Sequence, residues 1–218
     1  AIKKGLENNF TDAFGGPDAA DKSFTNLQKA INYSMTAVLT TGGIRGKKKT
    51  VGKFQPRSFN FGISKKAFTA TNGFSALKYG EDIDLTFRLW QHEFETQLIE
   101  QAFVYHKRRS SISDFFKQTY NFGTARPYLN KKYPKTVKIT YWFPRVFILF
   151  LMINLIWAYF GYGQFLYFYL VYFLILFFDS FLQNRSIIVA FLSVFTTLTQ
   201  FFGYGLGFLK SQFVNKNS

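Results

Sequence analysis

The hydrophobic pattern of the chain changes near residue 140. Before this point apolar and polar residues alternate over short segments, whereas residues 140–218 form nearly continuous apolar runs. The charged residues in these runs are Arg145, Asp179, Arg185, Lys210 and Lys216. We therefore predict a polar region at 1–139 and an apolar region at 140–218.

The apolar region contains three successive candidate spans, at about 141–160, 165–182 and 186–209. Each approaches the roughly 20 residues that cross a bilayer, and backbone groups in lipid must bond internally, so we expect three transmembrane helices. Tyr141 and Trp142 at the start of the first span suit a membrane interface. The alternative is a buried helical bundle of a soluble protein.

The positive residues predict an orientation. Lys131, Lys132, Lys135 and Lys138 precede the first span, and Arg185 lies between the second and third. Because basic residues favour the cytoplasmic side, we expect a multi-pass protein with residues 1–139 in the cytoplasm. Lys210 and Lys216 then fall outside, so the last span could instead be re-entrant.

The first region is predicted to be mixed α/β. Its expected elements are a basic loop at 46–53, a strand at 58–63, a helix from Ser64 to Ala70, a turn at 71–73, a helix at 82–91, a strand at 96–105 and a helix at 113–122 capped by Ser113. Asp84 and Arg88 are spaced for an i,i+4 ion pair within the helix predicted at 82–91.

The amino-acid composition limits which ligands and cofactors the chain can bind. The absence of cysteine excludes disulfides and Cys-ligated zinc. The formal net charge of +15 predicts attraction to anions such as nucleotide diphosphates, anionic lipids or nucleic acid. We exclude nucleic acid as a partner, because the aromatic residues crowd the apolar spans and do not interleave with the basic residues.

One stretch combines carboxylates and cations in an order that suggests chemistry. Gly80 precedes Glu81 and Asp82 at a predicted helix N-terminus, where one carboxylate can accept a proton from an attacking hydroxyl. The following strand ends in His106-Lys107-Arg108-Arg109, a cluster suited to a diphosphate. Taken singly, these residues could equally be a helix cap, a structural histidine and membrane-surface charges.

This order resembles the family 2 glycosyltransferases of GT-A fold, over roughly residues 10–130. It looks most like the membrane-bound members of the succinoglycan type, which build bacterial exopolysaccharide at the inner membrane. The resemblance is carried by Phe14-Gly15-Gly16-Pro17, Asn60 to Ser64, Asn72-Gly73-Phe74, Gly80 to Arg88, His106 to Ser110, and Phe116 through Gln118 to Arg126.

The resemblance implies an inverting hexosyl transfer from a nucleotide-sugar to a membrane-associated glycan or polyprenyl-linked acceptor. Asp82 would be the general base, with Glu81 as its neighbour. Further implied roles are diphosphate binding by His106, Arg108 and Arg109, metal contact by His106, and acceptor binding by Asn72, Gly73, Phe74 and Gln118.

Two departures from the family pattern matter. The family holds Mg²⁺ or Mn²⁺ mainly with an Asp-X-Asp motif that this chain lacks in a suitable place, so we expect the C-terminal half of a Rossmann-like GT-A domain, inactive alone. The Gln-X-X-Arg-Trp motif of processive synthases is replaced by Gln118 to Phe122, which favours non-processive transfer. The alternative function is a non-catalytic membrane module whose basic face binds anionic lipid.

Overall fold

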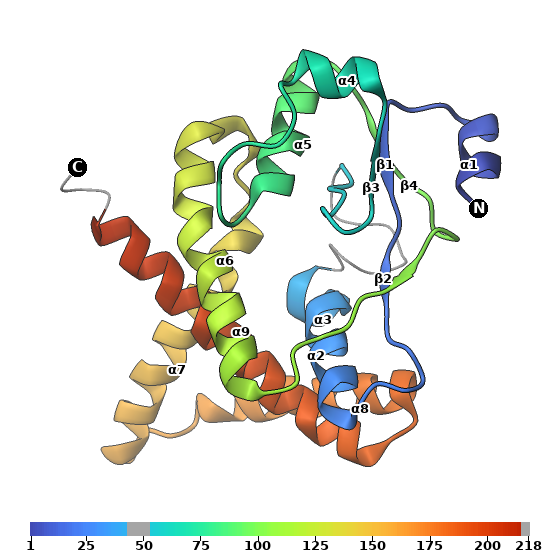
Figure 1. Ribbon diagram of the computed structural model, residues 1–218. Coiled ribbons are helices and arrows are strands. Elements are labelled where there is room, and N and C mark those ends of the chain that lie inside the picture. The colour runs from blue at the N-terminus through green and yellow to red at the C-terminus, as the bar shows by residue number, and fades with distance from the viewer. Residues whose placement is uncertain (43–52, 215–218) are drawn as a thin grey trace.

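The computed structural model describes residues 1–42 and 53–214, which form a mostly helical structure with two small sheets (Figure 1). In the larger sheet β1 (Ala13–Gly15) lies between β3 (Phe61–Ile63), which is antiparallel to it, and β4 (Thr96–Leu98), which is parallel. In the smaller sheet β2 (Asp18–Ala19) pairs in parallel with β5 (Val104–Tyr105). The predicted α/β character is therefore confirmed only in part.

Helices make up most of the described structure. They are α1 (Ile2–Asn8), α2 (Asn26–Thr36), α3 (Val38–Thr41), α4 (Lys65–Ala70), α5 (Glu81–Gln91), α6 (Ile112–Lys132), the 3₁₀ turns Pro134–Thr136 and Ile139–Tyr141, α7 (Phe143–Tyr159), α8 (Leu166–Asn184) and α9 (Ile187–Val214). The basic loop predicted at 46–53 lies outside the described residues, apart from Lys53.

Two predicted helices form at the expected places. The Ser64 hydroxyl accepts a hydrogen bond from the Ala67 amide at 3.1 Å and caps α4. Gly80 adopts a left-handed φ of 83°, which only glycine enters without strain, and directs the chain into α5 one residue before the predicted start. Asn72 and Gly73 also have positive φ, which confirms the turn between these helices.

Three predicted elements need correction. The strand expected at 58–63 is confined to Phe61–Ile63, and the one expected at 96–105 is divided into β4 and β5 by a turn at 99–103. The helix expected at 113–122 extends to Lys132, and its cap is Ser111, whose hydroxyl accepts from the Asp114 amide. Pro127 removes one backbone donor but does not end this helix.

α5 is packed on two sides. Leu85 and Leu89 pack with residues of β1 and α4, whereas Ile83 and Phe87 pack against Leu129 and Tyr133 at the end of α6. These alternating contacts follow the helical period and hold α5 between the larger sheet and α6. The first turn of α5, which carries the predicted catalytic carboxylates, is thereby fixed relative to both.

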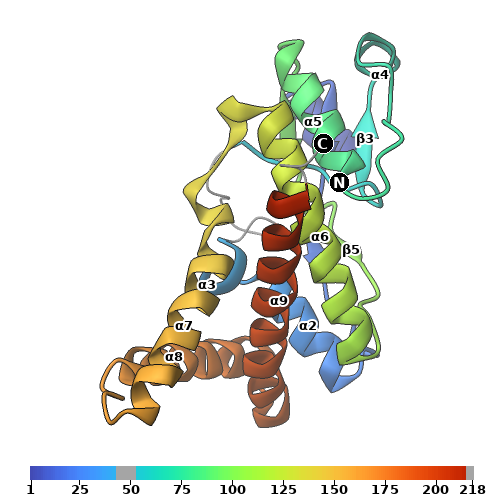
Figure 2. The same ribbon diagram turned by 90° about the vertical axis from the view of Figure 1, so that its left-hand side faces the viewer.

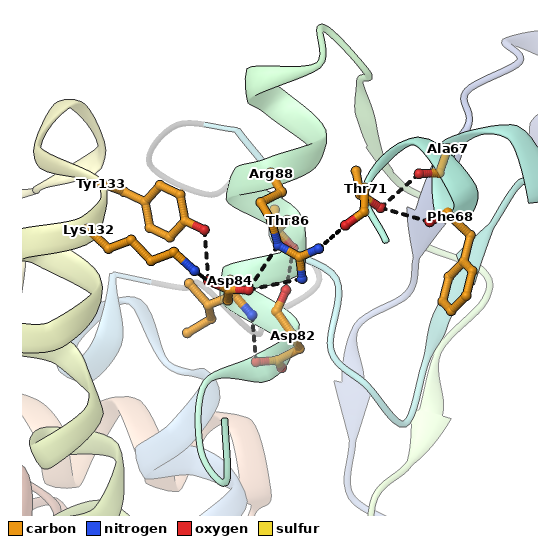
Figure 3. A network of polar contacts seen from close by, with 10 residues as sticks. Ala67, Phe68, Thr71, Asp82, Asp84, Thr86, Arg88, Lys132 and Tyr133 are labelled. Atoms are coloured by element: carbon orange, nitrogen blue, oxygen red, sulfur yellow. Dashed lines mark hydrogen bonds and ion pairs between the residues drawn. The ribbon is translucent and has the colours of Figure 1, made fainter. Parts of the chain in front are cut away.

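A buried carboxylate adds a polar link between α5 and α6 (Figure 3). The Asp84 side chain is fully buried and accepts hydrogen bonds from Arg88 Nε at 3.0 Å, Lys132 Nζ at 2.7 Å and Tyr133 Oη at 2.7 Å. Burial raises the pKa of Asp84, but the bonds from Lys132 and Tyr133 and the charge of Arg88 outweigh it, so this pKa lies below its ordinary value. The predicted Asp84–Arg88 pair is confirmed, and Arg88 also donates to the Thr71 carbonyl.

The three predicted apolar spans correspond to α7, α8 and α9. Of the described helices, α8 and α9 are long and apolar enough to cross a membrane, whereas the 17 residues of α7 make a shorter apolar helix. α8 lies crosswise to α9 in Figure 2 and does not run alongside it. Large apolar side chains on these helices are more than two-fifths exposed, among them Val146, Leu149, Phe150, Met152, Phe168, Leu170, Val171, Leu174 and Phe178. Exposure on this scale is typical of a lipid or partner interface.

α2 connects the polar region to the apolar helices. The Tyr33 hydroxyl donates to the Asp179 carboxylate of α8 at 2.6 Å, and the Ser34 hydroxyl lies 2.6 Å from that of Thr196 in α9. These bonds give buried polar groups of the apolar helices their partners. The polar and apolar regions that meet near residue 140 in the sequence are therefore packed against each other in the structure.

α6 and α9 run side by side in contact (Figure 2). Glycines occupy the crossing: a Cβ at Gly207 would meet the Tyr120 carbonyl oxygen, one at Gly203 the Thr119 hydroxyl, and one at Gly123 of α6 the Tyr204 carbonyl. Small residues spaced four apart allow such close backbone approach. This close contact packs α6 directly against α9, the longest apolar helix.

This close approach predicts that Gly207→Ala destabilises the protein. Its methyl group would meet a backbone oxygen that cannot rotate away, so we expect a loss of about 1–3 kcal/mol in free energy of unfolding. Thermal unfolding of the detergent-solubilised protein measures it. Leu206→Ala is the matched control, because Leu206 is 45% exposed and should change stability far less. Equal stability of the two variants would contradict the helix crossing.

The Asp84 network predicts an acid-sensitive contribution to stability. Because the folded-state pKa is lowered, the contribution is complete above the unfolded-state pKa of about 3.9 and is lost as pH falls through the folded-state value. At about pH 7 we expect Asp84→Asn to cost about 3 kcal/mol, at the low end for a broken buried ion pair since Lys132 is partly exposed. Urea unfolding over a pH series tests this.

The control for that experiment is Glu95→Gln, which removes an exposed carboxylate and should cost less than about 0.5 kcal/mol. The difference between wild type and Asp84→Asn should shrink at acid pH. A difference that stays constant from neutral to strongly acid pH would show that the ionised carboxylate is not the stabilising form.

Candidate active site

One large cavity, of about 1030 Å³, lies between the polar region and the apolar helices. Its walls come from the end of α2 and α3, the segment 57–59, the first turn of α5, the residues after β5 and one face of α6. The turn at 139–142, the start of α7 and part of α9 complete them. A cavity of this size holds a large ligand. It is therefore the candidate site against which the predicted residues are compared.

Asp82 and Glu81 line the cavity from the first turn of α5. The Asp82 side chain is only 12% exposed, and one of its oxygens accepts the Ile83 amide at 2.8 Å. Its other oxygen lies 3.7 Å from Arg57 Nη1. The Asp82 carboxylate therefore lies between the N-terminus of α5 and a cationic side chain.

His106 lines the same cavity with its ring stacked on Phe59, at 3.9 Å between centroids. Arg108 Nη1 lies 3.0 Å from His106 Nδ1, and because a guanidinium group can only donate, Nδ1 is the acceptor. The proton of the neutral ring is then on Nε2. This nitrogen is set to donate a hydrogen bond to an anionic oxygen.

Arg108 and Arg109 have different surroundings. The Arg108 side chain is buried, with Nη2 donating to the Asp18 carboxylate at 2.6 Å and to Asn32 Oδ1 at 2.9 Å, and it does not line the cavity. Burial lowers the pKa of Arg108, and the Asp18 charge opposes that shift. Arg109 is exposed and lines the cavity. Of this pair, the structure brings only Arg109 to the cavity wall.

The predicted acceptor residues separate in the same way. Gln118 of α6 lines the cavity. Asn72, Gly73 and Phe74 do not: they follow α4, where the Phe74 ring packs edge-on against Phe61 and Phe68. Gln118 and Asp82 therefore line the same cavity, whereas the turn at 72–74 lies outside it.

Sequence reasoning missed four cationic residues of the cavity, Arg57, Lys78, Lys117 and Arg126, of which Arg57 and Arg126 are buried. Arg126 had a detectable signal: Gln118, Phe122, Ala125 and Leu129 recur at helical spacing, and a helix continued past residue 122 places Arg126 beside that face. Arg57 precedes the predicted strand, and nothing in the residue order indicates its approach to Asp82.

The described residues do not provide a metal site by themselves. No group of three or more His, Cys, Asp or Glu side chains within 1–42 and 53–214 is arranged to hold a metal ion. His106 also has its Nδ1 occupied by Arg108 and a proton on Nε2, which leaves no free lone pair for a metal. The metal contact predicted for His106 thus does not fit this arrangement.

Comparison with known proteins supplies a family. The model of the family described as glycosyl transferase family group 2 matches residues 59–203, a segment that includes Asp82, His106, Gln118 and Arg126. No curated protein and no solved structure shows significant similarity to the chain. Because the match covers more than half of the 218 residues, the chain belongs to glycosyl transferase family group 2.

Proposed function

We propose that this chain carries the acceptor side of an inverting glycosyltransferase that uses Asp82 as its general base. The observation that supports this most directly is the cavity in which Asp82, His106 and Arg109 all line the wall. Membership of the family implies a nucleotide-sugar donor and an acceptor in general. The succinoglycan type, hexosyl transfer and non-processive action remain part of the proposal.

The proposed reaction is a single displacement. An acceptor hydroxyl attacks the anomeric carbon of the donor sugar, its proton passes to the Asp82 carboxylate, and the bond from that carbon to the diphosphate breaks with its electron pair. Asp82 is suited to this because it lies in the first turn of α5 beside Arg57, in a largely water-excluded part of the cavity wall. Glu81 would orient the acceptor beside it.

The diphosphate leaving group needs positive charge. His106 Nε2–H and Arg109 supply donors at the cavity wall, while Arg108 positions the His106 ring through its bond to Nδ1. Arg108 would thus be a positioning residue and not a direct phosphate ligand. A divalent cation held by residues outside this chain, and the inactivity of residues 1–218 alone, stay predictions.

The acceptor would be membrane-associated. α7 and α9 contribute to the same cavity that contains Asp82, and α8 and α9 are apolar and long enough to cross a membrane. A cavity with walls on both the polar region and the apolar helices suits an acceptor whose sugar end is polar and whose anchor is not. We propose an inner-membrane, multi-pass protein with residues 1–139 as the cytoplasmic part.

The base assignment predicts that Asp82→Asn in the complete protein lowers sugar transfer by about 10²–10⁴-fold, because the amide cannot accept the acceptor proton. Donor binding should be unchanged. Transfer of radiolabelled sugar to membrane acceptors measures the first, and equilibrium binding of the nucleoside diphosphate measures the second.

Asp114→Asn provides the matched control for this experiment, since Asp114 is another acid at the cavity wall but lies in the first exposed turn of α6. It should leave transfer close to wild type. Substantial transfer by Asp82→Asn, or an equal loss in both variants, would refute the role of Asp82.

A further inference from the structure

Arg126 is a buried cation without a carboxylate partner. It is 8% exposed, and its guanidinium carbon lies 4.0 Å from the centre of the Tyr141 ring. None of the ion pairs found between described residues includes it, and its Nη1 has no hydrogen-bond partner among them. Arg126 is hydrogen-bonded to the Tyr204 side chain, and stacking on Tyr141 offsets part of the cost of burying the charge. Neither contact supplies a counter-charge, and Nη1 is left without an acceptor.

Two neighbouring polar groups share this condition. The Tyr141 hydroxyl and the Gln200 side-chain oxygen are buried and lack hydrogen-bond partners within the described part of the chain. Both residues line the cavity together with Arg126. Arg57 Nε is a further unpaired atom at this cavity, on the side of Asp82. Buried polar atoms are normally paired, so the unpaired atoms of Arg126, Tyr141 and Gln200 indicate a polar ligand.

The chemistry of the three groups specifies that ligand. Arg126 requires an anion, and the Tyr141 hydroxyl can donate to the same anion. The Gln200 oxygen requires a donor such as a sugar hydroxyl. A phosphate group joined to a sugar meets all three needs, whereas a neutral glycan leaves the guanidinium group unpaired.

The position of Arg126 separates it from the donor-side cations. His106 and Arg109 follow β5, whereas Arg126 contacts Tyr141, just before α7, and shares the cavity wall with Gln200 of α9. Both of these helices are apolar, and many side chains of α7 are exposed. A phosphate at Arg126 would therefore lie where the polar cavity meets the apolar helices.

We propose that Arg126, with Tyr141 and Gln200, binds the phosphate group of a lipid-linked acceptor. The proposal rests on the proposed function in one respect, namely that the cavity receives an acceptor. It assigns Arg126 to the acceptor phosphate and leaves the donor diphosphate to His106 and Arg109. The lipid chain would leave the cavity along the apolar surface of α7.

The test measures binding of farnesyl phosphate, farnesol, inorganic phosphate and a nucleoside diphosphate to the complete protein in detergent. Trp142 lines the cavity, so its fluorescence reports occupancy. Wild type should bind farnesyl phosphate at least about 10-fold more tightly than farnesol or inorganic phosphate. Arg126→Gln should weaken farnesyl phosphate binding by about 10- to 100-fold and leave farnesol unchanged.

Two further variants give the comparison. Lys131→Gln removes an exposed charge of α6 outside the cavity and should change nothing. Arg109→Gln should weaken the nucleoside diphosphate and spare farnesyl phosphate. If Arg126→Gln is poorly folded, Arg126→Lys replaces it, and the wild-type preference for the phosphorylated lipid stands as an independent test.

Several results would overturn the proposal. Equal wild-type affinity for farnesol and farnesyl phosphate would exclude a phosphate site, and equal affinity for inorganic phosphate would exclude a lipid-linked one. If Arg126→Gln weakened binding of the nucleoside diphosphate alone, Arg126 would have to be assigned to the donor. Asp82→Asn should bind farnesyl phosphate normally. Phosphate-dependent binding by a wild-type protein that transfers no sugar would refute the proposed function and leave the Arg126 assignment intact.

Discussion

The structure depends most on the burial of the Asp84 carboxylate between α5 and α6. One acid without solvent contact is satisfied by Arg88 from its own helix and by Lys132 and Tyr133 from the end of α6. A charge so buried tolerates little movement of its donors, because each lost bond leaves an uncompensated group. The position of the first turn of α5 relative to α6 is therefore fixed. As a consequence, Asp82 and Gln118 line the same cavity.

The glycine crossing extends this constraint to the apolar helices. α9 approaches α6 closely at Gly203 and Gly207, and between these glycines Tyr204 lines the cavity. α9 is therefore both a helix apolar enough for a membrane and a wall of the candidate site. This arrangement would let the proposed membrane-anchored acceptor reach Asp82 without leaving the lipid surface. The hydrogen bonds from α2 to α8 and α9 stabilise the same junction.

Local signals in the sequence predicted the parts of the site that depend on local structure. Gly80 before two acids indicated a helix start, and the i,i+4 spacing of Asp84 and Arg88 indicated their pair, since both depend only on helix geometry. The contacts from Lys132 and Tyr133 join residues 48 and 49 positions away, and no periodicity encodes them. The end of α6 was missed for a different reason: Pro127 and polar residues near it suggest a break, but tertiary packing on α5 and α9 continues the helix.

Burial and partners, more than residue type, decide what each cation of this chain can do. Arg108 is committed to Asp18 and Asn32, so its charge is used within the protein and its remaining contact orients His106. Arg109 is exposed at the cavity wall, where its guanidinium group can bind an anionic ligand. Arg126 is buried like Arg108 but contacts the side chains of Tyr141 and Tyr204 in place of a carboxylate, so we propose that its charge is available to a ligand. A sequence shows three arginines of equal charge, whereas their surroundings distinguish a structural ion pair, a proposed donor-side contact and a proposed acceptor site.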